Sequence, residues 1–150
     1  MSNNVDKPEG INVIELAFER LAKQGDLSFL EQYAMYMGKA QILEMGLKGV
    51  LIRKFNYEEE TIDRWTLGRI ANELKENNIR EDFTAFLDGV VEFRNYIAHD
   101  ILADDALIKS LTNGKGMTKQ SRILSKAAIE LEQLMIMYDL CQEHDEWVPE

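Results

Sequence analysis

The side chains best suited to chemistry lie in one short segment of this 150-residue chain, and they are Arg94 and His99. The guanidinium of an arginine stays charged, and its planar fork of donors suits a phosphate or a transition state that gathers charge on phosphoryl oxygens. Histidine is the side chain that changes charge near neutral pH, so it can take or give a proton. The two residues therefore predict acid–base chemistry on a phosphate ester.

The surrounding residues predict an amphipathic helix with an arginine in its apolar face. Arg94 and His99 are five residues apart, which on a regular helix means about 140° of rotation and about 7.5 Å of rise. One helix does not pair them, so we expect a second copy of the helix to complete the site, rather than a bent arginine or a loosened helix end. The apolar face comprises Phe83, Phe86, Leu87, Val90, Val91, Phe93, Ile97 and Ala98.

Arg94 and His99 also have explanations that need no ligand, and two neighbouring residues can assist a site or be ordinary surface residues. An arginine in an apolar face must be paired, and an internal salt bridge to a carboxylate such as Glu44 explains Arg94 as well as a bound phosphate does. His99 near a helix C-terminus interacts favourably with the free carbonyls there. Asn95, one turn before His99, can orient its ring or contact a 2′-hydroxyl. Tyr96 can contact a base or a phosphate, although an exposed tyrosine is ordinary.

The run R-N-Y-I-A-H at residues 94–99 resembles the Arg-polar-x-x-x-His signature of HEPN domains, and residues 66–74 resemble the helix that commonly precedes it. The resemblance implies a metal-independent endoribonuclease that acts as a homodimer, with both arginines and both histidines in one composite cleft. Arg94 and His99 would then be catalytic, and Asn95 and Tyr96 would bind the RNA substrate. No cofactor is implied.

The resemblance also suggests biological settings and an alternative function. A toxin paired with an antitoxin protein and a phage-defence component are both compatible with it. The toxin subgroup often carries a tyrosine two residues after the histidine, where this chain has Ile101. The formal net charge of −10 argues against broad capture of nucleic acid, although a local cleft can still be basic. The alternative is a non-catalytic HEPN-like module that binds a nucleotide, RNA or a partner protein; a structural dimer or adaptor is a third possibility.

Other kinds of active site have little support. The chain has no glycine-rich phosphate loop, GxSxG elbow or His-Glu-x-x-His motif. Cys141 is the only cysteine, which excludes an intrachain disulfide. Three possible ligands, Cys141, His144 and Asp145, crowd one helix end and do not make a closed metal site. We therefore expect no metal.

The sequence predicts an all-α fold, an up-and-down bundle of about four main helices with short extra helices. The only prolines, Pro8 and Pro149, lie at the ends, and no alternating β-branched run indicates a sheet. Residues 1–10 are expected to be a flexible lead-in, and residues 11–150 a single HEPN-like domain. Helices are predicted over residues 12–23, 28–54, 61–65, 67–76, 80–99, 104–111 and 118–143, with a loop at residues 112–117.

Within the long helix at residues 28–54, Gly38, Ile42, Met45, Gly49 and Ile52 share one face. Glycine costs about 1 kcal/mol relative to alanine inside a helix. We therefore expect the glycines at positions 38, 46 and 49 to allow close packing by another helix or to accept a bend.

The N-terminal residues lack the charged and apolar regions of a secretory signal. No apolar run approaches the roughly 20 residues that span a bilayer. We expect a cytoplasmic protein without a membrane segment.

Overall fold

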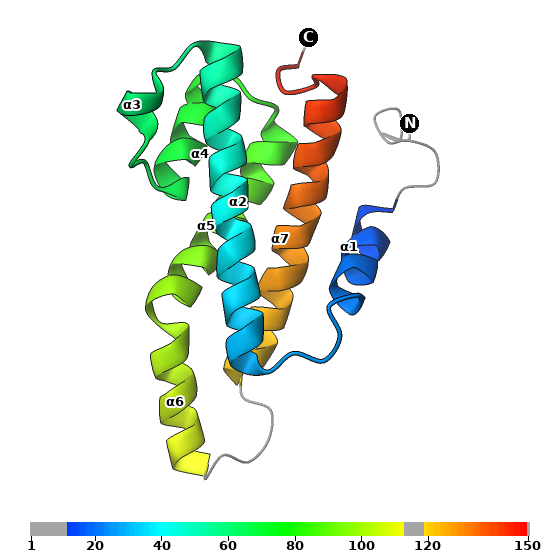
Figure 1. Ribbon diagram of the computed structural model, residues 1–150, viewed down its shortest axis with the longest axis vertical. Coiled ribbons are helices and arrows are strands. Elements are labelled where there is room, and N and C mark those ends of the chain that lie inside the picture. Colours follow the sequence, from blue (N-terminus) through cyan, green and yellow to red (C-terminus); the bar gives the residue numbers. More distant parts are fainter. Residues whose placement is uncertain (1–11, 113–118, 150) are drawn as a thin grey trace.

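The computed structural model describes residues 12–112 and 119–149, which contain seven α-helices and no strand (Figure 1). The predicted all-α bundle is confirmed. None of the helices in these two stretches is both long enough and apolar enough to cross a bilayer. The helices are α1 (Val13–Ala22), α2 (Phe29–Phe55), α3 (Glu59–Ile62), α4 (Leu67–Glu76), α5 (Glu81–His99), α6 (Ile101–Thr112) and α7 (Lys119–His144).

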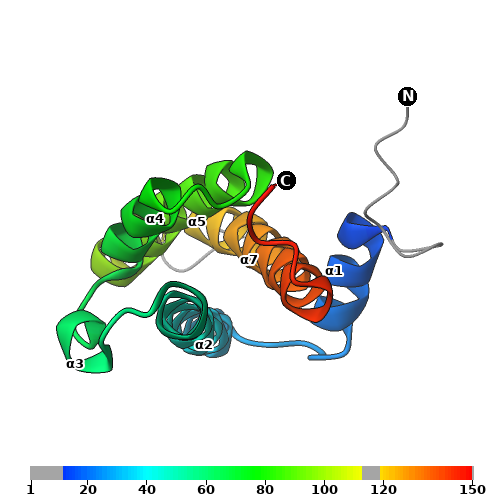
Figure 2. The ribbon, with the colours of Figure 1, turned by 90° about the horizontal axis from the view of Figure 1, so that it is seen from above.

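The long helices α2, α5 and α7 form the centre of the bundle. α2 and α7 run in the same direction and α5 runs opposite to them (Figure 1). α1 packs on the outer side of α7, and α4 packs on α5 and α2 (Figure 2). α6 begins where α5 ends and extends past the ends of α2 and α7 (Figure 1).

Side-chain caps begin three of these helices, each within one residue of its predicted start. Ser28 Oγ accepts a hydrogen bond from the Glu31 backbone N–H at 3.1 Å, and the Glu31 carboxylate accepts one from the Ser28 N–H at 3.0 Å. Thr66 Oγ1 accepts the Arg69 N–H at 3.3 Å, and Asn12 caps α1. Each cap satisfies N–H groups that the first turn of a helix leaves free, which is why the sequence located these helix starts well.

The core lies where α2, α4, α5 and α7 meet, and Trp147 covers one end of it. The Trp147 ring is 98% buried and packs edge-on against Phe83 and Tyr138, with ring centres 5.1 and 5.2 Å away. The Arg80 backbone N–H donates to the Trp147 carbonyl at 2.9 Å, which ties the end of the chain to the start of α5. Other fully buried side chains are Leu47, Leu51, Ile70, Leu74, Leu87, Leu124 and Leu131.

Two helices differ from their predicted bounds. α6 begins at Ile101 instead of residue 104, since the Asp104 N–H already bonds to the Asp100 carbonyl and no glycine or proline interrupts residues 100–112. α3 begins at Glu59, directly after the acidic residues that favour a helix N-terminus. The predicted loop beyond Thr112 and the predicted lead-in at residues 1–10 lie outside the described residues.

The predicted packing face of α2 is exposed in its middle, so the expectation of close packing is wrong there, whereas Ile52 at its end packs against the core. Ile42 and Met45 are 62% and 70% exposed, and a Cβ added at Gly38 would meet nothing within 4 Å. Of the three glycines, Gly46 is the one that allows close approach of another helix, because a Cβ there would lie 3.0 Å from the Tyr138 ring of α7. A Cβ at Gly49 would lie 2.5 Å from the Arg53 side chain of α2 itself. The face of α2 that is buried comprises Tyr36, Ala40, Leu43, Leu47, Val50 and Leu51.

Candidate functional site

The candidate site is the C-terminal part of α5, where the sequence places Arg94 and His99. Both residues lie within the helix, which is continuous from Glu81 to His99. The regular helical spacing therefore applies, and it separates their side chains by about 140° around the axis. A single chain does not bring the guanidinium and the imidazole together.

The apolar face of α5 is buried within its own chain. Phe83, Leu87, Val90 and Ile97 are at most 1% exposed, and α5 packs on α7, α4 and α2. The buried part of this face is therefore not available to a second copy of the helix. Three neighbouring helices of the same chain already supply the apolar surface that covers it.

Arg94 projects from this buried side of α5 and remains half-buried. Within residues 12–112 and 119–149 its guanidinium has neither a carboxylate within 4.0 Å nor a hydrogen-bond acceptor. The internal salt bridge to Glu44 is thus not formed. The guanidinium lies near α2, since burial raises the pKa of Tyr36 while the charge of Arg94 opposes that shift. No described residue occupies the donors of Arg94, so they are available to another partner.

His99 is the last residue of α5, and its side chain is exposed. In the described part of the chain it makes no hydrogen bond with Asn95, one turn earlier, or with a carbonyl of the last turn. Asn95 is exposed as well. Both side chains are accessible to a substrate or to a second protomer.

Tyr96 has a role within the chain that sequence reasoning missed. Its hydroxyl donates to the Asp104 carboxylate at 2.9 Å, which links α5 to α6. Burial, followed by this hydrogen bond, raises the pKa of Tyr96. The signal in the sequence is an aspartate eight residues after the tyrosine. It indicates a contact only once the two residues are assigned to consecutive helices. A hollow of about 280 Å³, lined by Glu92, Phe93, Tyr96 and Ile123, lies beside this tyrosine.

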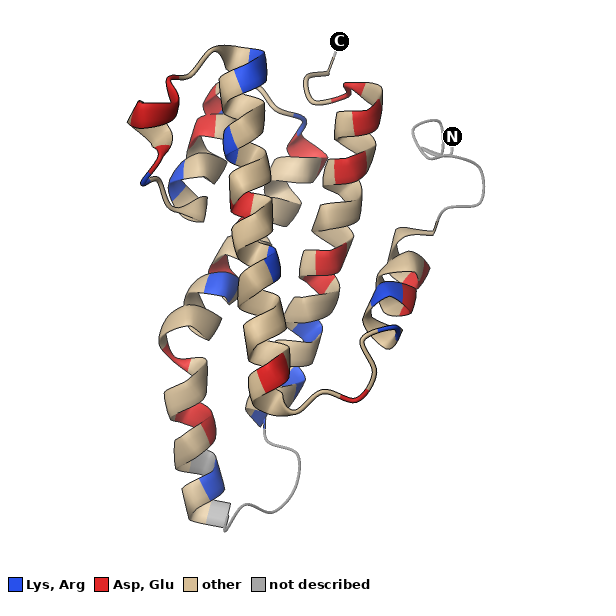
Figure 3. Ribbon diagram, in the orientation of Figure 1, with Lys and Arg blue, Asp and Glu red and all other residues tan. Residues whose placement is uncertain are grey.

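A basic strip formed by Lys119, Arg122 and Lys126 lies at the start of α7, the helix that packs against α5 (Figure 3). All three side chains are exposed, and no carboxylate occurs on α7 before Glu130. The Lys126 ammonium lies 5.9 Å from the centre of the Phe93 ring, which places the strip against α5. The net charge of the chain did not predict this strip. The sequence signal for it is that residues 119–129 contain three basic residues and no acidic one.

The possible metal ligands at the end of α7 do not converge. Cys141 is buried, and burial raises its pKa to about 11, whereas His144 and Asp145 are exposed. The Asp145 carboxylate pairs with the Lys54 ammonium at 2.7 Å. Over residues 12–112 and 119–149 no three His, Cys, Asp or Glu side chains are grouped closely enough to hold a metal ion.

Comparison with known proteins gives no match: no family model, no curated protein and no solved structure is similar to this chain.

Proposed function

We propose that this protein is a metal-independent endoribonuclease of the HEPN type that acts as a homodimer, with Arg94 and His99 as catalytic residues. One observation carries the proposal. A guanidinium that is partly removed from water is normally paired, yet Arg94 is half-buried without an ion pair or hydrogen bond among the described residues. An arginine whose donors are not used by described residues can bind a phosphate. Arg94 also occupies the arginine position of the Arg-polar-x-x-x-His signature that residues 94–99 resemble.

The reaction is attack of a ribose 2′-hydroxyl on the adjacent phosphate. His99 takes the proton of that hydroxyl as a general base, and Arg94 stabilises the charge that gathers on the phosphoryl oxygens. The bond from phosphorus to the 5′-oxygen breaks, and the leaving 5′-oxygen takes a proton from water while His99 returns its proton to the solvent. The products are a 2′,3′-cyclic phosphate and a 5′-hydroxyl.

Two protomers are needed because α5 presents Arg94 and His99 on different sides. A symmetric dimer joined through the exposed C-terminal end of α5 would place the arginine of one protomer near the histidine of the other. The basic strip on α7 would contact the RNA backbone. Asn95 would contact the ribose, and the Tyr96 ring would contact a base, since the Tyr96 hydroxyl is already bonded to Asp104.

The proposal is tested by incubating the full-length protein with mixed RNA in the presence of a chelator. We expect cleavage that leaves cyclic phosphate ends, and Arg94→Ala and His99→Ala should each reduce its rate by at least about a hundredfold. Matched controls are Arg64→Ala and His144→Ala, because both side chains are exposed and lie outside the proposed site. Intact RNA, or a His99→Ala variant as active as the wild type, would contradict the nuclease proposal.

The net charge of −10 favours a second candidate, a non-catalytic module that binds RNA, a nucleotide or a partner protein. RNA that is retained but uncut, with retention lost in Arg94→Ala, would indicate this module. We further propose that the protein acts in the cytoplasm. A toxin or phage-defence role, with an antitoxin protein as partner, is a further proposal; growth arrest on expression of wild type but not of His99→Ala would support it.

A further inference from the structure

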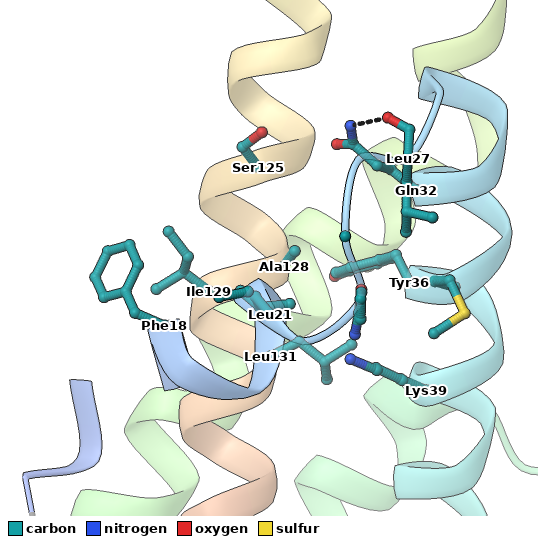
Figure 4. A pocket seen from close by; sticks show the side chains of 14 residues that line it. Phe18, Leu21, Leu27, Gln32, Tyr36, Lys39, Ser125, Ala128, Ile129 and Leu131 are labelled. Atoms are coloured by element: carbon teal, nitrogen blue, oxygen red, sulfur yellow. Dashed lines mark hydrogen bonds between the residues drawn. The ribbon is translucent and has the colours of Figure 1, made fainter. Parts of the chain in front are cut away.

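A cleft of about 350 Å³ lies between α1, the segment after α1, the start of α2 and the middle of α7 (Figure 4). None of residues 94–99 lines it. Its volume is at the lower end of the range for small-molecule sites, roughly 300–1,000 Å³. Most of the lining is apolar and includes Phe18, Leu21, Leu27, Met35, Ile129 and Leu131.

The Tyr36 hydroxyl is the unusual polar group of this cleft. Tyr36 is only 2% exposed, and its hydroxyl has no hydrogen-bond partner among the described residues. Figure 4 shows the side chain pointing from α2 across the cleft toward α7. Burial raises the pKa of Tyr36, so the hydroxyl stays protonated and can donate a hydrogen bond. A buried donor without an acceptor destabilises the empty protein, and a bound acceptor would relieve that cost.

Lys39, one turn after Tyr36, supplies further donors on the same side of α2 (Figure 4). Its ammonium donates to one oxygen of the buried Glu132 carboxylate at 2.8 Å, and the other oxygen lies 3.7 Å from the Arg20 guanidinium. Glu132 therefore has cations on both oxygens. An ammonium has three donors, so Lys39 keeps capacity for another acceptor.

A hydrogen bond from a side chain to the backbone holds the side of the cleft that faces α7. The Gln32 side-chain amide donates to the Leu27 carbonyl at 2.9 Å, which fixes the segment before α2 at the edge of the cleft (Figure 4). The cleft thus combines apolar walls with hydrogen-bond donors from Tyr36 and Lys39. That combination is typical of a site for an apolar molecule with one polar end.

We propose that this cleft binds a mainly apolar small molecule whose one polar end is an oxygen acceptor, a carboxylate or a carbonyl, held by the Tyr36 hydroxyl and the Lys39 ammonium. The apolar part packs among Phe18, Leu21 and Leu131. None of the residues proposed for the nuclease lines this cleft, although the Arg94 guanidinium lies near Tyr36. The ligand proposal does not depend on the nuclease function.

The test is a titration of ¹⁵N-labelled full-length protein with sodium decanoate and, separately, with 2-decanone, followed by NMR. At least one probe should bind with a Kd below about 1 mM and shift amide signals of α1, residues 23–28 and residues 125–131. The stronger probe tells whether a carboxylate or a carbonyl is preferred. No shift of these signals with either probe would overturn the proposal.

Two variants locate the binding. Tyr36→Phe should weaken the stronger probe by about five- to tenfold, with a melting temperature equal to or above that of the wild type because an unpartnered hydroxyl is removed. Ala128→Phe should fill the cleft and abolish binding, whereas Ala85→Phe, on the exposed side of α5, should not. Unchanged affinity in Tyr36→Phe and Ala128→Phe would overturn the proposal. So would shifts of residues 1–11 in ligand-free Ala128→Phe, since the chain's own start would then be the occupant.

Discussion

At the scale of single residues, Arg94 carries a charge that no described residue pairs with. Arg94 stands among side chains that are buried on the same face of α5, yet no described carboxylate neutralises it. A charge left in such a position weakens the fold unless it serves a ligand. An apolar substitution of Arg94 should therefore abolish function without a loss of stability.

Arg94→Leu should stabilise the chain and abolish RNA cleavage. Leucine removes the desolvated charge and fills the same face, so the free energy of unfolding should rise by about 1 kcal/mol. Urea denaturation of the variant and the wild type measures the difference. A loss of several kcal/mol would mean that Arg94 has a structural partner, and it would remove the main support for the nuclease proposal.

Cys141 is the other residue whose chemistry the fold changes. Burial raises the pKa of its thiol from 9.0 to about 11, so the folded state favours the neutral form. The stability that this contributes is fully present below pH 9 and is lost as the pH rises toward 11. The folded thiol should also react with a disulfide reagent at pH 8 at least about a hundredfold more slowly than the thiol in urea.

The measurement is unfolding as a function of pH for the wild type and Cys141→Ala. The variant should lose less stability between pH 9 and pH 11. Parallel curves, or a folded thiol that reacts as fast as the unfolded one, would show that the side chain is accessible.

At the scale of helices, the sequence predicted where each helix starts and ends far better than which helices pack against one another. The bounds of α1, α2, α4, α5 and α7 were predicted to within one residue, because caps such as Ser28 and Thr66 act locally. The exposed face of α2 was not predicted, since periodicity shows which residues share a face and not which partner covers it. The bond from Tyr96 to Asp104 was not predicted, and neither was the absence of a partner for Arg94 among the described residues. Both depend on how the helices lie in space.

The two glycines Gly38 and Gly46 give a matched test of this packing in α2. Gly38→Ala should stabilise the helix by about 1 kcal/mol, because a Cβ there meets open space. Gly46→Ala should destabilise the protein by a similar amount, about 1 kcal/mol, because the Cβ would lie 3.0 Å from the Tyr138 ring. Thermal and urea unfolding compare the variants. Equal effects at both positions would show that α7 does not approach α2 at Gly46.

At the scale of the whole molecule, charge and symmetry set what the protein can do. The net charge of −10 repels nucleic acid in general, so RNA would have to approach along the basic strip beside α5. Neither the strip nor the half-buried Arg94 completes a site within one chain, since His99 lies about 140° away around the helix. The nuclease proposal therefore requires two protomers.

Mixing the two inactive variants tests this requirement most directly. An Arg94→Ala chain retains His99, and a His99→Ala chain retains Arg94. After unfolding and refolding together in equal amounts, half of the dimers should be mixed, each with one intact composite site. RNA cleavage should then recover to about a quarter of the wild-type rate, while each variant refolded alone stays inactive. If wild type cleaves RNA but the mixture does not recover, the arginine and histidine do not act across two chains and the central claim is contradicted.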